Sequence, residues 1–435
     1  MNARAAFAVL FIAAIVPAEG SAQLVPFAPP LARATTQKPT GEPGSDLTVY
    51  LLTFGQGDAV WELFGHNAIW IKDHTHGTDL TYNWGMFDFN QPHFIERFLT
   101  GDTRYWMEAI DLEPMLQYYK QQNRSILAQE LNLTPAQRLS LQQFVQLNAL
   151  PQNKFYRYDY YRDNCSTRLR DALDHALGGQ LQTSTVSRPT SGTYRTHTQR
   201  LMQGNFPLYT GVTLALGQPA DKPLSMWEEM FLPVRMANDL RSVRIADSTG
   251  AQIPVVKSEL ALFTAGRSPE PVSAPNRIPL FVVIGLVTAG LLVLLVRSAE
   301  GGNRAAMFGA TALSSLWSLI AGLGGIALVI AWVATKHYFM GHNENLVQFD
   351  PLSIALVILI PLSVYGLRGV SKARKLSAWI AALSLAGLIA QGVSFFDQSN
   401  GEIIALALPL NLAVLWTVYR LTTYRRTSRP SSAAL

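Results

Sequence analysis

The chain of 435 residues contains a single cysteine, Cys165, at the predicted start of a helix. A polar run, residues 163–166, surrounds the thiol, and apolar residues then recur at helical spacing over residues 169–177. The first turn of a helix has unpaired backbone N–H groups and the positive end of the dipole, so we expect a lowered thiol pKa there. Cys165 is therefore the candidate nucleophile. The alternative is a structural cysteine packed as a small apolar residue.

A thiol nucleophile needs a proton acceptor, and histidine is the side chain whose pKa suits this role near neutrality. Of the eight histidines we select His66, which lies at the start of an apolar stretch predicted to be a strand. A purely structural histidine is the alternative. His175 lies ten residues along the helix of the nucleophile, or about 15 Å, which is too far. His74 and His76 have a spacing found in metal sites, but their polar, turn-forming loop favours solvated histidines.

A third polar group would hold the imidazole in the required tautomer. Asn83 is the leading candidate because it lies on the strand predicted to follow that of His66, and Asp88 is the second. The oxyanion of an acyl-transfer intermediate would be held by the backbone N–H of Cys165, together with Tyr158 or Tyr160.

These residues fall in one segment of mixed α and β character, residues 47–262, which is long enough to bury its own core. Thr134, Pro135 and Gln137 predict a capped helix to residue 149. Residues 92–99 are predicted to be helical, and residues 242–258 a hairpin. Alternating or continuous apolar patterns predict strands at residues 47–54, 66–72, 81–89, 103–110, 125–133 and 155–160.

The flanking segments place this domain outside the cytoplasm. Residues 1–22 have the basic start, apolar run and small residues of a secretory signal peptide, although an uncleaved anchor is the alternative. Residues 23–46 are rich in proline and are interpreted as an extended linker, as are residues 263–277. An unpaired thiol in such a compartment is exposed to oxidation, which favours a reactive role for it.

The segment at residues 278–420 is predicted to be an all-α membrane domain, followed by a cytoplasmic tail at residues 421–435. It contains five apolar stretches of spanning length, at residues 278–296, 307–335, 351–367, 377–395 and 403–419. Arginines and lysines are concentrated in alternate loops, so the positive-inside rule places those loops in the cytoplasm and the outer domain on the opposite side. The net charge of +5 then needs no nucleic-acid partner to explain it.

The segment contains four distinctive motifs: Phe64-Gly65-His66-Asn67-Ala68, residues 82–89, residues 160–168 and residues 227–233. Together they resemble the extracytoplasmic domain of Lnb-type lipoprotein N-acyltransferases. The order of histidine strand before cysteine helix also resembles the permuted NlpC-type branch of the papain-like superfamily, which includes lecithin:retinol acyltransferase-like enzymes. The resemblance covers about residues 50–240, and Gln56-Gly57-Asp58 departs from the Pro-Gly turn expected there.

The resemblance implies an α+β fold and a thiol-dependent acyltransferase of the bacterial inner membrane, with its catalytic domain in the periplasm. Cys165 would take an acyl chain from a phospholipid as a thioester and pass it to the α-amine of a diacylglyceryl-cysteine lipoprotein. His66 is carried over as the base, and the reaction requires no cofactor and no metal. Two alternatives stay open: a Cys-His peptidase or amidase acting on cell-wall peptide, and a non-catalytic membrane binding protein.

Overall fold

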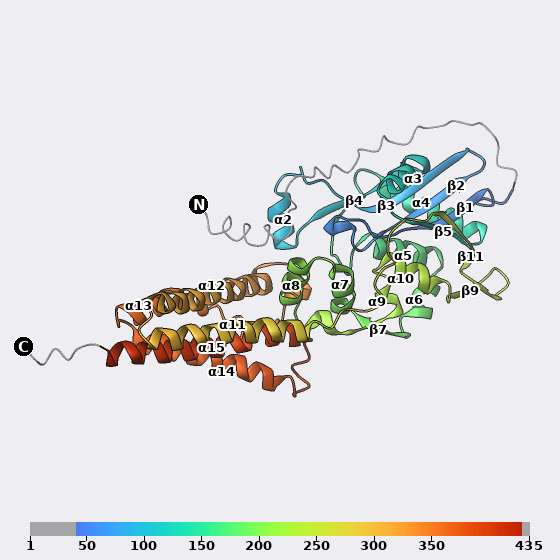
Figure 1. Ribbon diagram of the computed structural model, residues 1–435. Helices are drawn as coiled ribbons and strands as arrows, with labels where there is room; N and C mark the ends of the chain where they lie inside the picture. The colour runs from blue at the N-terminus through green and yellow to red at the C-terminus, as the bar shows by residue number, and fades with distance from the viewer. Residues whose placement is uncertain (1–40, 429–435) are drawn as a thin grey trace, which may run out of the picture. The chain divides into compact units, whose positions relative to one another are not determined.

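The computed structural model describes residues 41–428 (Figure 1). The predicted signal peptide and most of the predicted linker that follows it lie outside these residues. The chain forms two compact units, and neither of them is continuous in sequence. Of the described residues, the first unit contains residues 41–202 and 223–273, and the second contains residues 203–222 and 274–428.

The first unit is built on a seven-stranded antiparallel sheet with the strand order β11-β5-β1-β2-β3-β4-β6. Strands predicted from apolar patterning are present with ends that differ by up to three residues. The six predicted strands are β1 (Leu47–Phe54), β2 (His66–Asp73), β3 (Thr78–Met86), β4 (Arg104–Asp111), β5 (Ile126–Leu131) and β6 (Phe155–Arg157). The seventh strand, β11 (Val256–Phe263), was not predicted as a separate strand.

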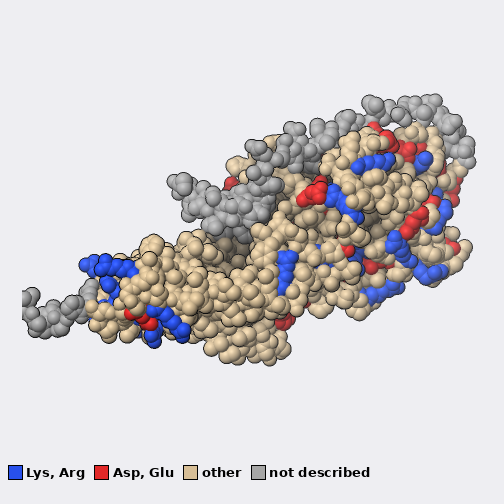
Figure 2. Space-filling view, viewed as in Figure 1, with Lys and Arg blue, Asp and Glu red and all other residues tan. Residues whose placement is uncertain are grey.

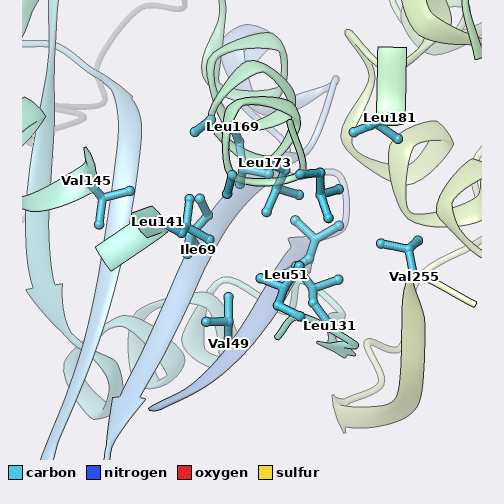
Figure 3. Packing of buried hydrophobic residues seen from close by; sticks show 14 of the residues in the cluster. Val49, Leu51, Ile69, Leu131, Leu141, Val145, Leu169, Leu173, Leu181 and Val255 are labelled. Carbon is cyan, nitrogen blue, oxygen red and sulfur yellow. The ribbon is translucent and has the colours of Figure 1, made fainter. Parts of the chain in front are cut away.

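One face of the sheet is covered by α4 (Pro135–Ala149) and α5 (Cys165–Ala176). Figure 3 shows Leu169 and Leu173 of α5 directed toward Ile69 and Leu51 of the sheet. These four side chains are at most 1 % exposed, and burying an apolar side chain of this size contributes about 1.5–3 kcal/mol. The helix that begins at Cys165 is therefore fixed against the strand that begins at His66.

The opposite face of the sheet is covered by α3 (Leu112–Gln121), a helix that we did not predict. Met115 and Tyr119 of α3 pack with Leu52 and Phe54, whereas Leu51 faces the other layer. Because both faces of the sheet are covered, the last four residues of β1 are all buried, and buried and exposed residues do not alternate there.

The remaining elements of this unit are short. The predicted helix at residues 135–149 is confirmed: Thr134 caps it, and Gln137 completes the capping box. The predicted hairpin near residue 250 is also present, as β9 (Arg244–Ala246) and β10 (Gln252–Pro254). The others are η1 (Val60–Glu62), α2 (Phe94–Thr100), α6 (Gln180–Thr185), β7 (Pro189–Thr193), α7 (Tyr194–Met202), β8 (Pro223–Ser225), α9 (Met226–Glu229) and α10 (Pro233–Leu240).

The second unit contains four helices that are long and apolar enough to cross a membrane. We predicted five spans, but the third apolar stretch forms only α13 (Ser353–Tyr365), whose 13 residues extend about 20 Å, less than the apolar thickness of a bilayer. Figure 2 shows lysine and arginine side chains gathered at one end of this unit and uncharged surface along its middle. The spanning helices are α11 (Ile278–Glu300), α12 (Arg304–Ala334), α14 (Val370–Ala390) and α15 (Gly401–Thr427).

A segment from within the predicted outer domain belongs to this second unit. It comprises α8 (Phe206–Ala215) and η2 (Gln218–Asp221), which contact the loops that join the spanning helices. Tyr209 donates to Glu402 at 2.8 Å, and the Asn343 amide donates to the carbonyl oxygens of Leu214 and Ala215 at 3.0 and 2.9 Å. The loops also contain η3 (Tyr338–Met340) and η4 (Glu344–Val347).

Candidate active site

Cys165 is the first residue of α5, as the sequence predicts, and a complete cap fixes its position. The side chain of Asn164 accepts hydrogen bonds from the backbone N–H groups of Ser166 and Thr167, both at 2.9 Å. Thr167 Oγ1 accepts from the backbone N–H of Asn164 at 2.8 Å. The Asn164 amide also donates to the carbonyl oxygens of Tyr160 and Phe231 at 3.0 Å each, so the cap is tied to two other segments.

The predicted low pKa of the thiol is not found. Backbone hydrogen bonds from Asn67, Ser166 and Cys165 itself act to lower the pKa of Cys165, as a helix start should. Burial has the larger and opposite effect, and it raises the pKa of Cys165 to about 11. The desolvation of an anion in this packed site outweighs the helix start, so at neutral pH the resting group is a thiol.

Gly85 on β3 brings the sheet against the start of α5. Its φ is +94°, and a Cβ there would lie 3.1 Å from Cys165 Cβ. The pairing of β3 with β4 also shifts register between Trp84 and Met86, which places a bulge at this glycine. The close approach and the backbone conformation both favour glycine over any other residue.

His66 is the first residue of β2, and its Nε2 lies 3.2 Å from Asn83 Oδ1. The Asn83 amide donates to the carbonyl oxygen of Thr81 at 3.1 Å and to Thr81 Oγ1 at 3.2 Å, which directs its oxygen toward His66. Nε2 of His66 must therefore carry the hydrogen, and Nδ1 is left with a lone pair. Burial lowers the pKa of His66 to about 4, with a further contribution from the charge of Arg124, so the ring is neutral at pH 7.

The two segments that carry Cys165 and His66 are joined directly. Asn67, which follows His66, provides a backbone hydrogen bond to Cys165, and its side-chain amide is 3.1 Å from Ser166 Oγ. Ser166 Oγ in turn donates to the carbonyl oxygen of Met230 at 2.6 Å. The start of β2 and the start of α5, nearly 100 residues apart in the chain, therefore lie against each other.

The other sequence candidates lie elsewhere or have different partners. Asp88 is exposed and accepts a hydrogen bond from the backbone N–H of Asn90 at 2.8 Å, so of the two predicted third residues it is Asn83 that contacts His66. His74 contacts Thr48 Oγ1 at 3.0 Å, and His76 contacts the carboxylate of Asp73 at 2.8 Å.

Of the two tyrosines considered for the oxyanion, Tyr158 is the one whose pKa responds to a negative charge on the Cys165 sulfur. Burial raises the pKa of Tyr158 well above its ordinary value, and a thiolate at Cys165 is the next cause. The ring of Tyr158 stacks on Tyr105 with the centroids 4.2 Å apart. Tyr160 instead packs edge-on against Tyr161, at 4.6 Å between centroids.

Three residues that the sequence analysis missed surround the base. The ring of Tyr119 lies nearly parallel to that of His66, with 6.2 Å between centroids and 13° between planes. The guanidinium of Arg124, whose side chain is 3 % exposed, lies 4.6 Å from the centroid of Tyr119 and 3.2 Å from Glu62 Oε1. Tyr119 lies on α3 and Arg124 just after its end. Leu112, Met115, Leu116 and Tyr119 recur at i, i+3, i+4 and i+7, so this spacing is the signal that could have located the helix.

Residues 43–200 match the family model described as the Lnb N-terminal periplasmic domain. The match includes His66, Asn83 and Cys165 with the elements that carry them. This part of the chain is an Lnb N-terminal periplasmic domain. No curated protein and no solved structure matches the chain significantly. With four candidate spans within residues 41–428, the chain is a multi-pass membrane protein with an Lnb-type periplasmic domain.

Proposed function

We propose that this protein is a lipoprotein N-acyltransferase of the bacterial inner membrane, with Cys165 as nucleophile, His66 as base and Asn83 as the residue that positions His66. The observation that carries the proposal is the contact of His66 Nε2 with Asn83 Oδ1 beside the capped helix start of Cys165. A lipid donor is supported by the candidate membrane helices of the same chain, which would tether the periplasmic domain to a bilayer.

In the first half-reaction, His66 Nδ1 takes the proton of the Cys165 thiol as the sulfur attacks the ester carbonyl of a phospholipid. The tetrahedral oxyanion would be held by the backbone N–H of Cys165, with Tyr158 close by. When the C–O bond breaks, His66 returns the proton to the leaving oxygen of the lysophospholipid. The acyl chain is then bound to Cys165 as a thioester.

In the second half-reaction, the α-amine of a diacylglyceryl-cysteine attacks the thioester. His66 takes a proton from the nitrogen, the C–S bond breaks, and the proton passes to the departing sulfur. The products are an N-acylated lipoprotein and the free thiol. The neutral resting pair suits this general-base sequence, because His66 can accept a proton and Cys165 still has one to give.

The proposal is tested by reconstituting the full chain in phospholipid vesicles with a diacylglyceryl-cysteine peptide. Mass spectrometry should detect the N-acylated peptide with the wild type, none with Cys165→Ala, and an unchanged yield with Asp88→Ala as the control. A peptide that is cut rather than acylated would favour the peptidase alternative. N-acylation that survives Cys165→Ala would contradict the proposal.

A further inference from the structure

One end of the periplasmic domain exposes a cluster of large apolar side chains in mutual contact, which we call the aromatic platform. Its exposed members are Trp61 (37 %), Phe89 (43 %), Ile95 (52 %) and Phe98 (39 %). Trp61 packs edge-on against Phe89 at 5.2 Å, and Phe89 packs against Phe94 at 5.1 Å between centroids. A contiguous exposed apolar patch of this kind marks an interaction site far more often than scattered apolar residues do.

The platform is joined to the candidate active site by a series of stacked rings. Phe87, which is only 8 % exposed, contacts the rings of Trp61, Phe89 and Phe94. It also stacks on Tyr105 at 4.9 Å, and Tyr105 stacks on Tyr158 at 4.2 Å. Tyr158 is the neighbour of Cys165 described above, so a continuous series of packed rings connects the exposed surface to the surroundings of the thiol.

Basic side chains flank the platform. Arg97 lies on α2 itself, and Arg157 donates to the carbonyl oxygen of Gly101, the residue that ends α2, at 3.3 Å. Arg104 follows α2 closely and pairs with Arg157 across β4 and β6. Asp88, Glu96 and Asp102 are acidic residues of the same region, so the guanidinium groups are local positive sites rather than a net positive charge. Aromatic rings beside arginines are typical of surfaces at the level of lipid headgroups.

We propose that the aromatic platform docks on the lipid surface and receives the acyl chain of the phospholipid donor. The chemistry matches on three counts: apolar rings for the acyl chain, arginines for the phosphate, and a ring path that ends beside the nucleophile. A second copy of the chain would also cover apolar surface, but it would account for neither the arginines nor the path to Cys165. Only the assignment of the lipid as acyl donor rests on the proposed function; the docking itself does not.

Ile95 is the best place for a probe, because it is exposed and the ring contacts of the platform do not include it. An Ile95→Cys variant of the full chain, made in a Cys165→Ser background and carrying an environment-sensitive fluorophore, is reconstituted in nanodiscs. The control is the same label at Leu147, which is 59 % exposed on α4 of the same unit. In one set of samples the quencher is attached to the lipid acyl chains. In a second set the quencher is iodide in the aqueous phase.

We expect the label at position 95 to be quenched by the lipid-borne quencher and protected from iodide, and the label at position 147 to show the reverse. Equal lipid quenching at the two positions would overturn the proposal. So would protection from both quenchers that depends on protein concentration, which would identify a second copy as the occupant. Neither readout requires acyl transfer, so this test stands apart from the test of the enzyme.

A kinetic experiment then tests whether the platform binds the phospholipid donor. Ile95→Asp should raise the KM for phospholipid about tenfold and leave kcat nearly unchanged, because it removes apolar contact and adds a charge repelled by phosphate. Leu147→Asp should change neither parameter. An Ile95→Asp enzyme with an unaltered KM would contradict the donor assignment. If no variant transfers acyl chains while the label at position 95 is in lipid, the proposed function fails and the docking surface remains.

Discussion

The alkylation rate of Cys165 as a function of pH is the sharpest consequence of the site's electrostatics. Cys165 is the only cysteine in the chain, so a single mass-spectrometric signal reports its reaction with iodoacetamide. The thiolate is the reactive form. Because burial raises the pKa of Cys165 to about 11, the rate should rise tenfold per pH unit from pH 6 to pH 10, with no plateau near neutrality.

The magnitude follows from the pKa. At pH 7.4 a thiol of pKa about 11 is ionised in about one molecule in 4,000, against about one in 13 for a free cysteine of pKa 8.5. This difference of about 300-fold is partly offset by the greater nucleophilicity of the more basic thiolate, which increases the rate by a factor of about 10 to 18. We therefore expect Cys165 to react about 20 to 30 times more slowly than a cysteine peptide.

The base provides the control. The pKa of His66 is lowered to about 4, so its ring carries no charge at pH 7.4, and His66→Gln should leave the alkylation rate within about threefold of the wild type. The same variant should abolish acyl transfer, which uses His66 as a proton acceptor. A rate plateau below pH 8, or a large loss of alkylation in His66→Gln, would refute the reasoning, because both are signs of a resting thiolate-imidazolium pair.

Four further predictions test other parts of the structure. Asn83→Ala should lower kcat of acyl transfer about 10- to 100-fold because the imidazole of His66 loses its partner, while Asp88→Ala should have no effect; equal effects would contradict the assignment. Gly85→Ala and Gly77→Ala both place alanine at positive φ, but only the first meets Cys165, so thermal unfolding in detergent should show Gly85→Ala to be less stable by about 1–3 kcal/mol, and no difference would argue against the close approach. Since the pKa of His66 is lower in the folded state than its ordinary 6.5, the wild type should lose stability relative to His66→Gln as pH falls from 6.5 toward 4, and parallel stability curves would show that His66 is solvated. Tyr209→Phe removes the hydrogen bond to buried Glu402 and should cost about 1.5–3 kcal/mol in the same unfolding assay, whereas Tyr365→Phe, at a residue that is 42 % exposed, should cost little.

Local sequence signals located the elements of the site well. The apolar runs at residues 47–54 and 66–72 and the polar cap before Cys165 are properties of neighbouring residues, and the structure has β1, β2 and α5 where these signals place them. The spacing of Asn83 and His66 on neighbouring strands also follows from a local hairpin, since β2 and β3 pair directly. Local patterns thus suffice where sequence neighbours are also structural neighbours.

Properties set by distant segments were not accessible in this way. The pKa of Cys165 depends on how tightly the sheet and α5 exclude water, and the helix start alone suggests the opposite direction. Tyr119 on α3 and Arg124 just after it come to lie near His66 only because this segment packs on the sheet, which the spacing within the helix does not specify. The grouping of α8 with the membrane helices depends on contacts such as that of Tyr209 with Glu402, 193 residues later in the chain. Such partners are defined only by the folded chain.

The most direct test of the central claim is the intact mass of the protein after incubation with phospholipid vesicles in the absence of an acceptor peptide. We predict a mass increase of one acyl chain, located on the peptide that contains Cys165, removed by neutral hydroxylamine and transferred to a diacylglyceryl-cysteine peptide when it is added. An unmodified Cys165 in a preparation that nevertheless N-acylates the peptide would contradict the thioester mechanism.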